Sequence, residues 1–367
     1  MLKNLIPLKA SRAVWLLAST VAVAAVAAGA AGIVAGQGNA APALRAFRAS
    51  HPTKEAARFK HPQLKHPTLA HRVLKVKGSK ASDRIALRLR LGDPGILQVD
   101  VGDDGSGDFS FKLEKIARIA VDARAGDDFV RIDESNGVFT ENIPSTIDGG
   151  DGNDTIAGGN GIETLLGGGG NDLIDGNGGN DLAVMGTGDD TFVWDPGDGS
   201  DTVEGQAGAD TMRFNGANGA EQFDVSANGN RLKFFRTQGT ITMDTAGVER
   251  VDANALGGVD LVTVNDLSGT DVTALNIDLA GTLGGATGDG AADRVVVNAT
   301  NGNDAIDVSG DATAVKVSGL APIVTILHPE IANDRLEINT LAGNDTVETV
   351  GLAAGAIQLF LDGILVP

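Results

Sequence analysis

Seven acidic residues recur at nearly regular intervals in the middle of the sequence, and their spacing indicates cation chemistry. They are Asp154, Glu163, Asp172, Asp181, Asp190, Asp201 and Asp210. Each is the sixth residue of a nonapeptide whose fourth residue is glycine; the nonapeptides begin at positions 149, 158, 167, 176, 185, 196 and 205. A hard cation such as Ca²⁺ takes about six to eight oxygen ligands from carboxylates and backbone carbonyls. Loops rich in glycine and aspartate can supply both kinds of oxygen.

The other positions of each nonapeptide indicate how these acidic side chains are held. The eighth residue is apolar, as Ile156, Leu165, Ile174, Ala183, Phe192, Val203 and Met212. We expect the last three residues to form a minimal strand with this side chain in a thin core. The first six should form a turn, whose glycines adopt conformations closed to residues with a Cβ. With two nonapeptides in each coil of a stack, a loop should share ligands with the loop eighteen residues further along.

A sparser pattern flanks the nonapeptides. It begins at Arg118, Arg250, Arg294 and Arg335, and each arginine is followed by a glycine after eight residues, an aspartate after ten and an aliphatic residue after twelve. The aspartates are Asp128, Asp260, Asp304 and Asp345. We interpret each copy as a strand, a tight Gly-x-Asp turn and a second strand, which suits larger coils of the same stack. Separate β-hairpins in a sandwich are the alternative.

Two segments carry a resemblance to a known family. GGDGNDTIA (149–157) and GGGGNDLID (167–175) resemble the GGxGxDxUx repeats of the RTX, or haemolysin-type, calcium-binding family. The resemblance covers 149–213 and implies a right-handed parallel β-roll with Ca²⁺ between successive turns, held by loop aspartates and glycine carbonyls. The metal-binding residues that it implies, with Asp198 added from the sixth nonapeptide, are Gly150, Asp151, Gly152, Asp154, Gly168, Gly170, Asp172, Gly179, Asp181, Gly188, Asp190, Asp198 and Asp201. It places Asp154, Asp172 and Asp190 on one edge, and Asp181 with Asp201 on the other.

Several copies depart from this repeat. Glu163 replaces aspartate in the second loop, and its extra methylene shifts the carboxylate, so we expect weak binding there. Asn177 and Gln206 replace the second glycine, and the insertion of Trp194 and Asp195 breaks the register. We therefore expect three or four good calcium sites rather than a full array.

Charge is divided unevenly along the chain of 367 residues. Residues 1–90 carry sixteen Lys and Arg against two acidic residues, whereas the remainder carries thirteen against forty-six, a net charge of −33. Such an acidic field repels nucleic acid and anionic membranes and attracts cations. The chain has no cysteine, so disulfides cannot stabilise it.

The sequence predicts five segments. Residues 1–40 have the basic start, alanine-rich run and small residues of a secretory signal peptide; an uncleaved membrane anchor is the alternative. Residues 41–80 are basic and rich in His-Pro pairs, which indicates a disordered linker rather than a transition-metal site. Residues 81–148 form an N-terminal β region, 149–213 the nonapeptide β-roll, and 214–367 an irregular C-terminal β-solenoid.

We therefore expect an all-β, secreted, extracellular calcium-binding protein whose folding is coupled to Ca²⁺. An alternative is a calcium-dependent adhesin or surface-matrix protein that contacts cell-wall or extracellular polysaccharide. A β-helix enzyme acting on polysaccharide is less favoured, because tyrosine is absent and aromatic residues make up 4% of the chain. Motifs typical of serine hydrolases, zinc proteases and P-loop proteins are also missing, so we expect no catalytic residues.

Overall fold

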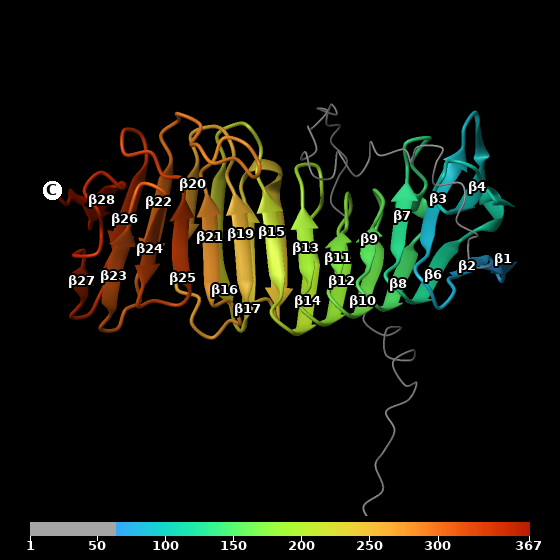
Figure 1. Ribbon diagram of the computed structural model, residues 1–367, viewed down its shortest axis with the longest axis horizontal. Helices are drawn as coiled ribbons and strands as arrows, with labels where there is room; N and C mark the ends of the chain where they lie inside the picture. The colour runs from blue at the N-terminus through green and yellow to red at the C-terminus, as the bar shows by residue number, and fades with distance from the viewer. Residues whose placement is uncertain (1–63) are drawn as a thin grey trace, which may run out of the picture. The chain divides into compact units, whose positions relative to one another are not determined.

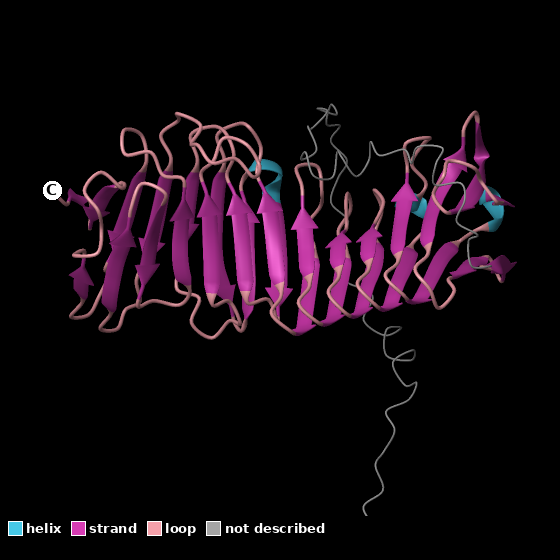
Figure 2. Cartoon of the chain, in the orientation of Figure 1, coloured by secondary structure: helices cyan, strands magenta, loops and turns pink. Residues whose placement is uncertain are grey.

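The computed structural model describes residues 64–367, which are all-β and form two long sheets (Figures 1 and 2). The predicted signal peptide and most of the predicted linker lie outside the described residues. In residues 64–367 the only helical elements are three short 3₁₀ turns, η3 (Leu113–Lys115), η4 (Thr140–Asn142) and η5 (Gln238–Thr240). None of the described segments is a helix with the length and apolar character needed to cross a bilayer.

The strands of residues 64–367 divide between a fifteen-stranded sheet A and a fourteen-stranded sheet B. In spatial order, sheet A contains β1 (Lys65–Ala70), β2 (Val73–Lys77), β6 (Arg118–Ala125), β8 (Ser145–Asp151), β10 (Glu163–Gly169), β12 (Leu182–Thr187), β14 (Thr202–Ala207), β18 (Ile241–Ala246), β17 (Arg231–Arg236), β16 (Gln222–Asn228), β20 (Leu261–Val264), β22 (Arg294–Asn298), β26 (Arg335–Asn339), β28 (Gln358–Leu361) and β29 (Ile364–Leu365). Sheet B contains β27 (Thr346–Glu348), β23 (Ala305–Gly310), β24 (Ala314–Ser318), β25 (Ile323–Leu327), β21 (Ala274–Asp278), β19 (Arg250–Asn254), β15 (Thr211–Asn215), β13 (Thr191–Trp194), β11 (Leu173–Asp175), β9 (Thr155–Ala157), β7 (Phe129–Asp133), β3 (Arg84–Arg90), β4 (Asp93–Val101) and β5 (Phe109–Lys112).

The nonapeptides build a stack of coils. Successive strands from β8 to β15 alternate between the two sheets, and each pairs in parallel with the strand one coil away. In sheet A this register aligns Ile147, Leu165, Ala183 and Val203, and in sheet B it aligns Ile156, Ile174, Phe192 and Met212. All eight side chains are fully buried. The predicted core position of every nonapeptide is thereby confirmed, and the two long parallel-rich sheets are consistent with a β-solenoid.

Two antiparallel meanders interrupt the parallel order. In sheet A, β16, β17 and β18 pair antiparallel, and in sheet B, β23, β24 and β25 do the same. The first meander begins with a hairpin in which Asn228 pairs with Arg231 across the two-residue turn Gly229–Asn230, a common hairpin connection. Where this meander joins the nonapeptides, Trp194 stacks on Phe214 with ring centroids 4.0 Å apart.

The flanking pattern forms strands and turns as predicted. The four arginines are the first residues of β6, β19, β22 and β26, and the four aspartates directly precede β7, β20, β23 and β27. In every copy the two strands belong to different sheets. The alternative of separate hairpins is therefore wrong for these segments, because the strands of a hairpin pair with each other in one sheet.

Two local predictions differ from the structure. The first three residues of a nonapeptide do not all belong to the turn, since β8 runs to Asp151 and β10 to Gly169, and these residues pair in register with the next coil. The predicted disordered linker is also wrong for residues 65–77, which form β1 and β2. In β2, Leu74 and Val76 alternate with lysines and are fully buried against β6. The gain from this burial outweighs the proline punctuation, which falls in edge strand β1.

Candidate metal centres along the carboxylate ladders

The acidic residues lie in rows along the two edges of the stack. We call the edge where the chain passes from sheet A to sheet B the lower edge, and the edge where it returns the upper edge, as they lie in Figure 1. The lower-edge residues are Asp83, Asp128, Asp154, Asp172, Asp190, Asp210 and Glu249, and then Asp304 and Asp345. The upper-edge residues are Glu163, Asp181 and Asp201, and then Glu221, Asp260, Asp293 and Asp334. Each stands directly before a strand, except Glu163, which is the first residue of β10, so a strand fixes the backbone of each.

Hydrogen bonds connect the lower-edge residues into a ladder. The backbone N–H of Asp154 donates to Oδ1 of Asp172 at 2.7 Å, and the N–H of Asp172 donates to Oδ1 of Asp190 at 2.7 Å. The same bond links Asp83 to Asp128, Asp128 to Asp154, Asp190 to Asp210, and Asp210 to Glu249, and a separate part of this row links Asp304 to Asp345. The partners within the nonapeptides are 18 or 20 residues apart. This interval confirms that two nonapeptides make one coil.

The upper edge carries the same ladder in two parts. Glu163 donates its N–H to Oδ1 of Asp181 at 2.7 Å, and Asp181 donates to Asp201 at 2.8 Å. The second part links Glu221 to Asp260, Asp260 to Asp293, and Asp293 to Asp334. The break falls where β17 and β18 separate β14 from β16 in sheet A. Both predicted edges are therefore present. The lower edge carries Asp154, Asp172 and Asp190, and the upper edge carries Asp181 and Asp201.

The second oxygen of most ladder carboxylates has no hydrogen-bond partner. In residues 64–367 this is true of Oδ2 in Asp128, Asp154, Asp172, Asp181, Asp190, Asp201, Asp210 and Asp260, and of Oε1 in Glu163. These residues are 0–3% exposed to solvent. A buried carboxylate oxygen without a donor is costly. A cation at this position would remove the cost.

The unpartnered oxygens face backbone carbonyls rather than donors. Oδ2 of Asp154 and the carbonyl oxygen of Gly167, one coil later, both lie beside the Cα of Gly149, and a Cβ there would clash with both. Oδ2 of Asp172 and the carbonyl oxygen of Met185 lie in the same way beside Gly167. Two oxygen acceptors that converge without a proton between them are a donor set for a hard cation. The residues therefore fit the calcium that the sequence predicts.

The predicted glycine ligands line the turns between coils. Gly150, Gly152, Gly168, Gly170, Gly179 and Gly188 all have positive φ. At Gly170, φ is 125° and a Cβ would overlap the carbonyl oxygen of Gly152 in the preceding coil. Only glycine allows this close approach, which brings carbonyl oxygens of successive coils together at the edge.

Two predicted ligands lie differently. The side chain of Asp151 is exposed and stands outside the ladder. Asp198 accepts the N–H of Asp195, and its pKa is raised well above the usual range by burial and by the charge of nearby Asp175. Within residues 64–367, no three or more His, Cys, Asp or Glu side chains form a group that could hold a metal. A site here must therefore combine carboxylates with main-chain carbonyls.

The ladders concentrate negative charge in a buried position. Burial, together with the charges of neighbouring carboxylates, raises the pKa of Asp154 to about 6, of Asp172 to about 7 and of Asp181 to about 9. For Glu163 the pKa rises to about 7, again mainly through burial. Residues 132–212 contain no Lys or Arg, so this segment offers no cationic side chain of its own to balance the charge.

Glu163 satisfies one of its carboxylate oxygens differently from the aspartates. Its longer side chain reaches back, and Oε2 accepts the N–H of Gly159 at 2.9 Å. That hydrogen bond occupies an oxygen that remains unpartnered in the aspartate copies. The geometry gives a physical reason for the weak binding predicted at the second loop.

Sequence reasoning missed several ladder members. Asp83, Glu221, Asp293, Asp334 and Glu249 continue the two rows outside the nonapeptides. A signal was present in three of them, because Asp83, Glu221 and Asp293 each follow a glycine by five residues, as the sixth residue of a nonapeptide follows its first. The irregular spacing between them hid the relationship.

The chain was compared with known proteins. No model of a protein family matches it, and the search of curated proteins gave no significant match. A proposal of function therefore rests on the sequence and the ladder geometry.

Proposed function

We propose that this chain is a secreted, extracellular calcium-binding protein whose nonapeptides, 149–213, form a right-handed parallel β-roll with Ca²⁺ between its coils. The observation that carries the proposal is the buried carboxylate oxygen that lacks a donor and lies beside a carbonyl oxygen of the next coil. The carboxylates that would hold the ions are Asp154, Asp172, Asp190 and Asp210 on the lower edge, and Asp181 and Asp201 on the upper edge.

The donor chemistry favours calcium over transition metals. The ladder provides only oxygen, from carboxylates and carbonyls, and oxygen-only sites suit hard cations. Without a cation the fold must bury several carboxylates whose raised pKa values oppose ionisation. Bound calcium would supply the missing positive charge, so binding and folding are linked. Extracellular calcium modules typically bind at about 10⁻⁴–10⁻³ M, and we expect affinities in that range.

Trp194 provides a reporter for the upper edge. Its Nε1 donates to the carbonyl oxygen of Gly199 at 2.8 Å, two residues before Asp201. A chain that starts at residue 41 lacks the chain's other tryptophan, Trp15. We expect the fluorescence of Trp194 and the far-ultraviolet circular dichroism of this chain to change together as calcium is added. No change in either signal up to about 10 mM calcium, well above the expected range, would contradict the proposal.

Two variants separate the edges in this titration. Asp201→Asn should remove most of the fluorescence response, whereas Asp154→Asn, on the opposite edge, should leave it largely intact. Glu114→Gln is the control, because this carboxylate is 68% exposed and lies outside both ladders. A fluorescence response that is equal in Asp201→Asn and the control would show that calcium does not bind at the loop next to Trp194.

A second candidate function, a calcium-dependent contact with extracellular polysaccharide, is favoured by a groove on the upper edge. The groove has a volume of about 470 Å³. A row of side chains in register crosses it on five parallel strands, formed by Gln222, Leu261, Arg294, Arg335 and Gln358. Amide and guanidinium groups suit sugar hydroxyls and carboxylates. Retention of the chain on a uronate-rich polysaccharide should require calcium and should fall in Arg335→Ala. Retention that changes neither when calcium is removed nor in Arg335→Ala would exclude this contact.

A further inference from the structure

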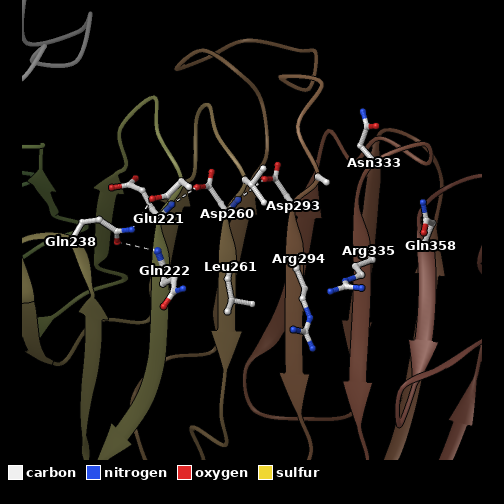
Figure 3. A pocket seen from close by; sticks show the side chains of 13 residues that line it. Glu221, Gln222, Gln238, Asp260, Leu261, Asp293, Arg294, Asn333, Arg335 and Gln358 are labelled. Atoms are coloured by element: carbon white, nitrogen blue, oxygen red, sulfur yellow. Dashed lines mark hydrogen bonds between the residues drawn. The ribbon is translucent and has the colours of Figure 1, made fainter.

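The second part of the upper-edge ladder lies outside the nonapeptides and repeats their geometry. Glu221, Asp260, Asp293 and Asp334 belong to coils whose successive members are 39, 33 and 41 residues apart. Each is at most 2% exposed. Figure 3 shows the first three of these carboxylates in one row beneath the loops, along the groove that they line.

Asp260 has the same unpartnered oxygen as the nonapeptide aspartates. Its Oδ1 accepts the N–H of Glu221 at 2.8 Å, whereas its Oδ2 is buried and has no hydrogen-bond partner in the described part of the chain. The turn before it is equally tight, because Gly258 has a φ of 126° and a Cβ there would lie 2.9 Å from the carbonyl oxygen of Gly219, one coil earlier. The main chains of successive coils therefore approach closely in the turn before Asp260, as they do at the nonapeptide loops. In the neighbouring turn, Oε2 of Glu221 and the carbonyl oxygen of Ala255 converge beside Gly216.

The charge around Asp260 is also unbalanced. Two further carboxylates come from the overlying loops, since Asp289 accepts the N–H of Gly258 at 2.7 Å and Glu330 accepts the N–H of Gly290 at 2.7 Å. Of the arginines at this groove, Arg236 pairs with Glu221, Arg294 pairs with Glu337, and Arg335 lies over the ring of Phe360. In the described part of the chain, none of these three arginines forms an ion pair with Asp260, Asp289 or Glu330.

We infer that Asp260 and Asp293, with carbonyl oxygens of the adjoining turns, form a further binding site on the upper edge for a divalent hard cation such as Ca²⁺. We call it the C-terminal cation site. The argument stands on the ladder bond, the buried unpartnered oxygen and the tight turn, none of which belongs to a nonapeptide. It shares with the proposed function only the identity of the cation. Calcium would then order the long loops of the C-terminal coils as well as the nonapeptide turns.

Calcium binding by the full chain, measured by isothermal titration calorimetry, tests this inference. Asp260→Asn keeps an oxygen that can accept the N–H of Glu221 and removes the charge, and we expect it to lower the stoichiometry by about one Ca²⁺ per chain. The matched control is Asp266→Asn, which alters an exposed carboxylate six residues away that accepts the N–H of Ser268. An Asp260→Asn chain with the stoichiometry and affinities of the control would overturn the inference.

Failure of this inference and failure of the proposed function give different results. If Asp172→Asn binds fewer calcium ions and Asp260→Asn binds as many as the unaltered chain, the proposed function stands and the C-terminal cation site is refuted. If Asp260→Asn does not fold, hydrogen–deuterium exchange of the unaltered chain decides the question. Calcium should slow exchange in residues 255–260 and 281–293. Equal exchange with and without calcium in both segments would refute the C-terminal cation site.

Discussion

Replacing Asp172 by asparagine should have opposite effects in the absence and presence of calcium. Oδ1 of Asp172 accepts the N–H of Asp154, and Oδ2 is unpartnered beside the carbonyl oxygen of Met185. Asparagine can keep the first bond and place an N–H donor against that carbonyl. It also removes the charge that the calcium site requires.

The magnitude follows from the pKa of this group. Burial, with the charges of Asp190 and Asp154, raises the pKa of Asp172 from 3.8 to about 7. About three pKa units correspond to about 4 kcal/mol, which is an upper value for the cost of holding the side chain ionised well above neutral pH. Metal-free Asp172→Asn should therefore be more stable than the unaltered chain by about 2–4 kcal/mol at about pH 8.

With calcium the order should reverse. A site filled at about ten to a hundred times its dissociation constant adds about 1.4–2.7 kcal/mol, and Asp172 lies between two coils that would both use it. Urea unfolding followed by circular dichroism, with a chelator or with saturating calcium, measures both effects, and Glu114→Gln is the charge-matched control. An Asp172→Asn chain that is destabilised without calcium yet gains as much from calcium as the control would refute the reasoning.

Three further predictions concern pH, turn geometry and the second loop. The pKa values of Asp154 and Asp172 in the folded chain, about 6 and about 7, lie above the ordinary 3.8, so the folded state binds more protons than the unfolded state. The free energy of unfolding without metal should therefore fall as the pH rises from about 4 to about 7. A urea midpoint that rises over this pH range would contradict this. Gly170→Ala should lower the free energy of unfolding by more than about 2 kcal/mol. Gly92 has a φ of 77° and open space around it, so Gly92→Ala should lower the free energy of unfolding by about 1 kcal/mol. Equal melting temperatures of the two variants would contradict this prediction. Glu163→Asp should tighten calcium binding measured by calorimetry, and unchanged affinity would mean that loop 158–163 is not a site.

Much of the nonapeptide region could be predicted because its physics is local and periodic. One apolar residue and one acidic residue in every nine specify which side chain enters the core and which lies at the edge. The burial of Ile156 and Phe192 and the ladder bond from Asp154 to Asp172 follow from that spacing. The same logic located the flanking strands, since Arg294 and Arg335 begin paired strands one coil apart.

Other features could not be predicted because they depend on contacts distant in sequence. Strand β14 pairs with β18 rather than with β16, and nothing in Thr202–Ala207 indicates that the chain turns back twice before the next coil. Glu221 and Asp293 belong to a ladder only because coils of different length place them above one another. Residues 65–77 become strands because β6 offers them an apolar partner.

The ladder bonds have a common direction, and this gives the stack a mechanical polarity. In each bond an N–H donates to the carboxylate of the coil that follows in the sequence. Peeling the stack from its C-terminal side would thus take an acceptor from the coil left behind, whereas peeling from the N-terminal side would take a donor. Order in such a one-dimensional array spreads between nearest neighbours. The meander β16–β18 interrupts the upper-edge ladder, whereas the lower-edge ladder runs past it to Glu249 and resumes at Asp304 and Asp345, with β21, β25 and β24 between. Each edge should therefore separate into two blocks, at different places along the stack.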